Sequence, residues 1–192
     1  MALEAKDIDF LRGSFGDPPL PVVSGQNAFA CTLMRNQGMV NTVALGASGT
    51  MLATAIILPG DVPVTNISVV TGGTAEVAGT SAWLALYTGD GRLMAQSTND
   101  TGATTVTANT VWTKALTTPQ KTFYAGLYYV AMSVTVTTTM PTLCGITQVT
   151  NAGLQAVTPL ISLTSGSGLG GTAPAAFSLP SSNVSIPYMF VS

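Results

Sequence analysis

The stretch YYVAMSVTVT, residues 128–137, alternates between two sets of side chains. One set is apolar along its whole length: Tyr128, Val130, Met132, Val134 and Val136. The other set becomes polar toward its end: Tyr129, Ala131, Ser133, Thr135 and Thr137. Because successive side chains of a strand point to opposite faces of a sheet, this alternation predicts a β-strand whose first set lies in the core.

Stretches on both sides of this one also have strand character, namely residues 51–58, 66–71, 81–87, 92–97, 110–116, 141–147 and 184–191. Thr88-Gly89-Asp90-Gly91 is turn chemistry, so the two stretches around it are predicted to form a β-hairpin. We expect a loop at residues 98–105 and no helix of ten residues in this part of the chain. The pattern predicts an all-β fold, an antiparallel β-sandwich of jelly-roll type.

The first 36 residues are predicted to be an extended N-terminal arm, and residues 37–192 the β-sandwich domain. Six charged residues lie within the first 17, and Pro18, Pro19 and Pro21 follow them. A short helix around residues 3–11 would be too short to be stable alone. The alternative is a disordered terminus, but the arm is more apolar than a solvated tail requires. We expect the arm to dock on a partner through Phe10, Leu11, Arg12, Phe15, Leu20 and Phe29, with Asp7 and Asp9 helping to fix the register.

Composition argues against an enzyme. Charged residues make up 7% of the chain, against roughly 25% in average soluble domains, and there is no histidine. No Asp, Glu, Lys, Arg or His occurs after Lys121. Without histidine a Ser-His-Asp or Cys-His site is excluded, and no pattern marks any lysine as a Ser-Lys base. The remaining acids, Asp61, Glu76, Asp90 and Asp100, lie in or beside turn residues, so we expect turn roles and no catalytic residue.

Four other features resemble functional sites, but a structural role is the favoured interpretation of each. Asp90, Asn99 and Asp100 are possible calcium ligands, but their spacing matches no known loop. The glycine-rich residues 165–171 lack the lysine and helix of a P-loop, which favours a flexible loop or an inter-subunit contact. Cys31 and Cys144 fit no metal spacing, and free buried thiols are favoured over a disulfide. We therefore expect no metal and no cofactor.

Aromatic side chains are the fourth feature. They offer a platform for sugar stacking, with core packing as the favoured alternative: Trp83, Tyr87, Trp112, Phe123, Tyr124 and Tyr129.

Net charge is only −2, which gives no electrostatic footprint for nucleic acid. Mean hydropathy is +0.45, yet no apolar run approaches the ~20 residues that span a membrane. The N-terminus has no apolar region typical of a secretory signal. Because solubility generally requires net charge well away from zero, we expect a homo-oligomer, a homotrimer or another symmetric assembly.

Several segments resemble small β-sandwich virion proteins of tailed bacteriophages, particularly those infecting actinobacteria. The resemblance covers about residues 50–192 but not the arm, and its motifs are core and turn residues: WLALY at 83–87, LMAQS at 93–97, GLYYV at 126–130, PTLCG at 141–145 and PYMFVS at 187–192.

This resemblance implies a structural role in the virion and transfers no catalytic residue. Such proteins are capsid decoration proteins, head fibres or minor tail proteins, assembled in the bacterial host cytoplasm. We expect the arm to bind the phage major capsid protein or tail proteins, decorating or cementing the capsid surface. The alternative is a minor tail protein or adhesin that binds host cell-wall carbohydrate.

Overall fold

The computed structural model describes residues 30–31, 38–147, 159–178 and 180–192. These residues form thirteen β-strands and no helix. The strands are β1 (Ala30–Cys31), β2 (Val40–Ala44), β3 (Met51–Leu58), β4 (Pro63–Val70), β5 (Val77–Thr88), β6 (Leu93–Gln96), β7 (Val111–Lys121), β8 (Gly126–Thr139), β9 (Thr142–Thr147), β10 (Ser162–Ser165), β11 (Ser181–Ser182), β12 (Ser185–Pro187) and β13 (Met189–Val191). The described chain therefore has no helix able to cross a membrane.

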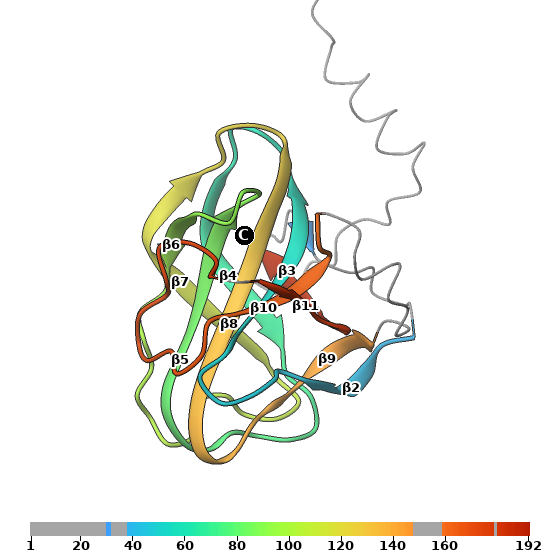
Figure 1. Cartoon of the computed structure of the whole chain (residues 1–192), viewed down its shortest axis with the longest axis vertical. Helices are drawn as coiled ribbons and strands as arrows, with labels where there is room; N and C mark the ends of the chain where they lie inside the picture. Colours follow the sequence, from blue (N-terminus) through green and yellow to red (C-terminus); the bar gives the residue numbers. More distant parts are fainter. Residues whose placement is uncertain (1–29, 32–37, 148–158, 179) are drawn as a thin grey trace, which may run out of the picture.

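The strands pair in three antiparallel sheets (Figure 1). The largest has six strands in the order β11-β10-β3-β8-β5-β6. A four-stranded sheet has the order β1-β13-β4-β7, and a three-stranded sheet has the order β12-β9-β2. The predicted all-β antiparallel sandwich is confirmed, and so is the hairpin of β5 and β6.

β8, the strand predicted most clearly, lies inside the six-stranded sheet. It pairs with β3 from Met51 opposite Ser133 to Leu58 opposite Gly126, and with β5 on its other edge. Its predicted core set faces the four-stranded sheet, and we call this side of the six-stranded sheet the inner face. The inner-face core includes Leu52, Ile56, Leu84, Leu86, Tyr128, Val130, Met132, Val134, Ile67, Val69, Trp112 and Met189, most of which have no exposed surface.

The opposite side of the six-stranded sheet, the outer face, is also buried. Its core contains Met51, Ala53, Trp83, Ala85, Tyr87, Tyr129, Ala131, Leu163 and Ala173. The irregular residues on either side of β10, 160–161 and 166–178, which we call the cover segment, supply much of this packing through Leu160, Leu169 and Phe177. The glycine-rich residues after β10 form a loop whose Leu169 packs against the outer face, while Ser167, Gly168 and Gly170 are exposed. The flexibility of this loop and its contact with another subunit stay predictions.

Hydrogen bonds from side chains of the sheet hold the cover segment in place. Trp83 Nε1 donates to the Gly170 carbonyl over 2.8 Å, and the Tyr87 hydroxyl donates to the Pro174 carbonyl over 2.9 Å. The Tyr129 hydroxyl donates to Leu160 O and Thr135 Oγ1 to Leu169 O, both over 2.8 Å. A segment without a full strand ladder leaves backbone carbonyls unpaired, and these donors satisfy them.

The structure also contains strands that the sequence pattern did not predict. β2, β10 and β11 have five, four and two residues, too few for a period-two signal to stand out. The stretch predicted at residues 184–191 is two strands, because the chain passes from the three-stranded to the four-stranded sheet at Tyr188. β1 lies within the stretch assigned to the arm and pairs with β13. The predicted docking residues Phe10, Leu11, Arg12, Phe15, Leu20 and Phe29 lie outside the described residues.

Candidate functional site

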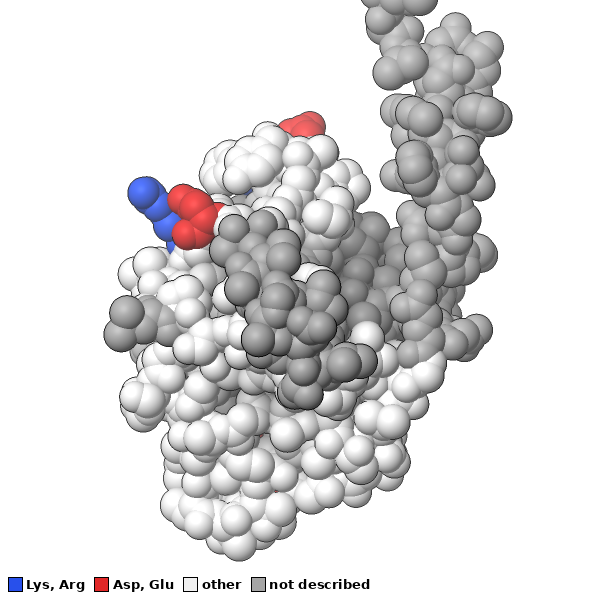
Figure 2. Space-filling view, turned by 45° about the vertical axis from the view of Figure 1, so that its right-hand side comes forward, with Lys and Arg blue, Asp and Glu red and all other residues white. Residues whose placement is uncertain are grey.

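The described residues carry seven charged side chains, and each is either paired or buried. Three cation–carboxylate pairs form: Arg92 with Asp90 at 3.1 Å, Lys114 with Asp100 at 2.6 Å, and Lys121 with Asp61 at 2.6 Å. On the face shown in Figure 2, charged atoms gather in two places near one end of the body, and the remaining described surface is uncharged. The body therefore presents almost no net electrostatic field.

The seventh charged residue, Glu76, is buried with 1% of its surface exposed. The expected turn role is wrong for this residue, because a loop distant in sequence covers it. The Thr105 backbone N–H donates to Glu76 Oε1 over 3.4 Å, and the Glu76 backbone N–H donates to Val106 O over 3.0 Å. Glu76 Oε2 has no hydrogen-bond partner among the described residues. Burial raises the pKa of this carboxyl, because desolvation disfavours its charged form.

The possible calcium ligands are committed to other partners. The Asn99 side-chain oxygen accepts from Ser81 Oγ and the Ala82 N–H, while Asp100 holds Lys114. Asp90 accepts from Thr88 Oγ1, and that hydrogen bond is the main reason why its pKa is lowered. Within the described ranges no cluster of three metal-ligating side chains occurs.

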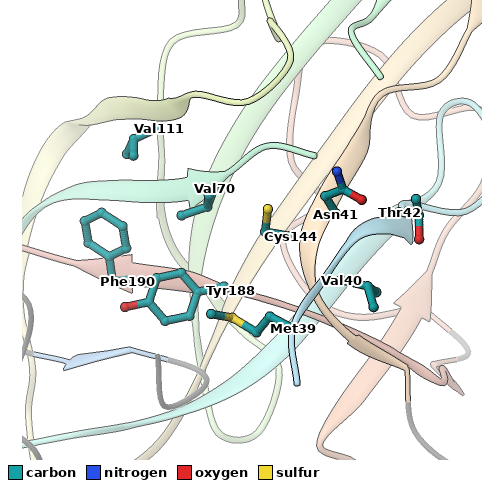
Figure 3. Close-up of a pocket in the computed structure, with 9 residues that line it drawn as sticks. All are labelled: Met39, Val40, Asn41, Thr42, Val70, Val111, Cys144, Tyr188 and Phe190. Carbon is teal, nitrogen blue, oxygen red and sulfur yellow. The ribbon is translucent and has the colours of Figure 1, made fainter. Parts of the chain in front are cut away.

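A pocket of about 660 Å³ opens between the three-stranded and four-stranded sheets (Figure 3). Most of its lining is apolar, and its polar side-chain groups are the Asn41 amide, the Thr42 and Tyr188 hydroxyls and the Cys144 thiol. Val40 and Val111 stand at its rim with 46% and 41% of their surfaces exposed. The lining is Met39, Val40, Asn41, Thr42, Val70, Val111, Cys144, Tyr188 and Phe190. It contains no Asp, Glu, Lys or Arg, so it suits an apolar contact better than acid–base chemistry.

Cys144 is a free thiol. Its Sγ donates a weak hydrogen bond to Thr71 O over 3.3 Å. Burial raises the pKa of this thiol, which lowers the fraction of the reactive thiolate at neutral pH. These properties are those of a structural cysteine.

The six aromatic residues proposed as a sugar platform do not lie together on the surface. Trp83, Tyr87, Trp112 and Tyr129 are buried, as expected for core packing. Phe123 and Tyr124, in the turn between β7 and β8, are 77% and 53% exposed. The platform is therefore reduced to one turn, at the top of Figure 1.

No protein-family model and no curated protein sequence matches this chain. The candidate sites therefore depend on geometry: the neutral surface, the apolar pocket and the aromatic turn.

The sequence pattern missed the pocket because its lining comes from five strands and two connecting residues, with no local motif. The only signal for the aromatic turn was its position between Pro119 and Gly126, outside the alternation of the neighbouring strands.

Proposed function

We propose that this protein is a non-enzymatic structural accessory protein of a tailed-phage particle, assembled in the bacterial host cytoplasm as a homotrimer or another symmetric oligomer. Residues 1–36 attach it to the major capsid protein or to tail proteins, and the sandwich faces outward. The observation that carries this proposal is the pairing or burial of every charged side chain of the described body. Copies of such a body can lie side by side without like-charge repulsion.

Two further observations support a role in assembly. Exposed apolar side chains are distributed over several strands and a connecting segment, namely Val40, Val77, Val111 and Ile161. The resemblance of residues 50–192 to phage virion proteins adds support from sequence. The apolar side chains of the arm are suited to lying over a capsid or tail surface, where burial of apolar area stabilises attachment.

The oligomeric state provides the first test. We expect light scattering coupled to size-exclusion chromatography to give a mass that is a multiple of the 19.5 kDa chain. Because neutral surfaces contribute little Coulomb energy, this mass should stay constant between low and high salt. A monodisperse monomer at micromolar concentration would contradict the assembly part of the proposal.

Attachment to particles provides the second test. The full chain with Phe10→Ser and Phe15→Ser should lose binding to phage particles that lack this protein, while the thermal unfolding of the body stays unchanged. A deletion is best ended at residue 28, because β1 begins at Ala30 and belongs to the four-stranded sheet. Retained binding by both variants would exclude the arm as the anchor.

A further inference from the structure

The turn between β7 and β8 exposes two adjacent aromatic side chains. Phe123 and Tyr124 are 77% and 53% exposed, and Phe123 is the most exposed large apolar residue of the described chain. Ile57, 67% exposed, lies at the same end of the sandwich, since it pairs with Leu127 near the start of β8. Exposed apolar groups gathered at one place are typical of a contact site.

Backbone contacts hold this turn in one conformation. Thr122 is buried and forms hydrogen bonds to the facing turn between β3 and β4: its Oγ1 donates to Pro59 O over 2.7 Å and accepts from the Val62 N–H over 2.9 Å. The Tyr128 hydroxyl donates to the Tyr124 carbonyl over 3.0 Å. Gly60 has no side chain, which lets its backbone lie against the backbone of Tyr124. The two rings are therefore presented by a rigid support, which lowers the entropy lost when a ligand binds.

A charged pair lies on the two turns at this end of the sandwich. Lys121 immediately precedes Thr122, and its ammonium contacts Asp61 Oδ1 at 2.6 Å. Asp61 belongs to the facing turn, and its N–H donates to Thr122 O over 2.9 Å. Both charged side chains are largely exposed, at 63% and 84%. Together they offer hydrogen-bond donors and acceptors to a ligand but no net charge.

We infer that Phe123, Tyr124, Lys121 and Asp61 form a binding site for a neutral oligosaccharide. The aromatic rings stack on the apolar face of a sugar ring, and the charged pair bonds its hydroxyl groups. The single cation is already paired, which disfavours phosphate-rich ligands such as nucleic acid. A standard protein interface buries about 1,600 Å² in total, far more than one turn offers, whereas two rings match one or two sugar units.

The site goes beyond the proposed structural role and does not depend on it. One turn gives weak binding, with a Kd on the order of 1 mM, which several linked copies would strengthen through avidity. The ligand probes are chitopentaose, maltohexaose and cellohexaose, each titrated into the full-length protein and followed by two-dimensional NMR. We expect at least one of them to shift the resonances of the turn.

Phe123→Ala should weaken this binding about tenfold or more, because it removes the most exposed ring. Asp61→Asn should weaken it less; asparagine tolerates the left-handed backbone at this position, where φ is 64°. The matched control is Val77→Ala. Val77 is an exposed apolar residue that lies opposite Thr139, at the end of β8 far from the aromatic turn, so its replacement should leave sugar binding unchanged.

Three results would overturn the assignment. They are the absence of resonance shifts with all three sugars at millimolar concentration, unchanged sugar affinity in Phe123→Ala, and dissociation of the oligomer by Phe123→Ala. The last result would make the turn a subunit contact. Light scattering of the unmodified protein tests the proposed assembly separately, so failure of one proposal is distinguishable from failure of the other.

Discussion

The two faces of the six-stranded sheet are buried in different ways. The inner face packs against strands whose backbone groups are already paired in ladders, and its side chains are mainly aliphatic. The outer face packs against the irregular cover segment, and its large side chains have polar tips that bond the segment's carbonyls: Trp83, Tyr87, Tyr129 and Thr135. A sheet that packs against regular strands needs only apolar contacts, because those strands already pair their own backbone groups. A sheet that packs against an irregular segment must also supply hydrogen-bond donors to the unpaired carbonyls of that segment.

Tyr128 on the inner face follows the same principle. It is fully buried among aliphatic side chains, yet its hydroxyl reaches the carbonyl of Tyr124 in an irregular turn. On both faces, therefore, a buried tyrosine hydroxyl reaches irregular backbone that lies against the sheet.

The largest expected effect is on the inner face. Leu84→Ala should lower the free energy of unfolding by about 2–5 kcal/mol, because it leaves a cavity between two sheets that cannot close over it. Urea denaturation at several protein concentrations measures the change and separates it from any effect of assembly. Ile161→Ala, at a site that is 56% exposed, serves as the control and should change stability little. A loss below about 1 kcal/mol for Leu84→Ala would contradict tight inner packing.

Below pH 8 the buried group whose titration should change stability lies on the inner side. Glu76 anchors the loop that carries Val106 of the inner core, whereas the outer face titrates only through Tyr87 and Tyr129, whose pKa values burial raises. Because the pKa of Glu76 is raised in the folded state, its protonated form stabilises the fold. That stabilisation is complete below the ordinary glutamate pKa and is lost as the pH rises through the folded pKa.

Glu76→Gln tests this sign. At neutral pH the variant should be more stable than the unmodified protein by about 1–3 kcal/mol, since it removes a buried carboxylate with an unpaired oxygen. The advantage should shrink as the pH falls toward 4, because Glu76 becomes protonated. Thermal unfolding of both proteins between pH 4 and pH 8 measures this difference in stability. A difference that grows as the pH falls would contradict the raised pKa of Glu76.

A smaller effect is expected at the outer face. Tyr87→Phe keeps the ring contact with Phe177 but removes the hydroxyl that bonds Pro174 O. Leaving this carbonyl unpaired should cost about 1–2 kcal/mol and increase proteolysis within residues 160–178. Tyr124→Phe removes an exposed hydroxyl and should do neither. Equal proteolysis of both variants would mean that the donors do not hold the cover segment.

The smallest effects compare two hydroxyls that have no partner among the described residues, Thr54 Oγ1 and Ser133 Oγ. Thr54 lies opposite Val130 in the pairing with β8, and Ser133 lies opposite Trp83 under the cover segment. Thr54→Val keeps the shape and should stabilise the protein by about 0.5–1 kcal/mol. Ser133→Ala removes the hydroxyl without replacing its volume, so its change should be nearer zero. Calorimetry of the two variants gives the ranking.

Local sequence predicted the elements whose pattern is long. Alternation in residues 128–137 located β8 and its core side, and Gly89 to Gly91 marked the hairpin turn. The cover segment has no period, so only the folded chain reveals that it closes the outer face. The turn residues around Glu76 predict a turn role for it, whereas its burial comes from residues 105 and 106, which lie far along the chain. Exposure likewise separates Phe123 from Trp83: Trp83 lies buried in the middle of β5, whereas Phe123 lies exposed in the turn after β7.

The strand order has a consequence for biosynthesis. β13 lies between β1 and β4, so β1 joins its sheet only through residues 189–191. While the chain is being synthesised, neither the four-stranded sheet nor the cover over the aromatic face can be completed until these late segments have left the ribosome. Nascent and truncated chains therefore expose an open sheet edge and an uncovered aromatic surface, which favours their aggregation. β1 therefore acquires its strand partner only after residues 189–191 have been synthesised.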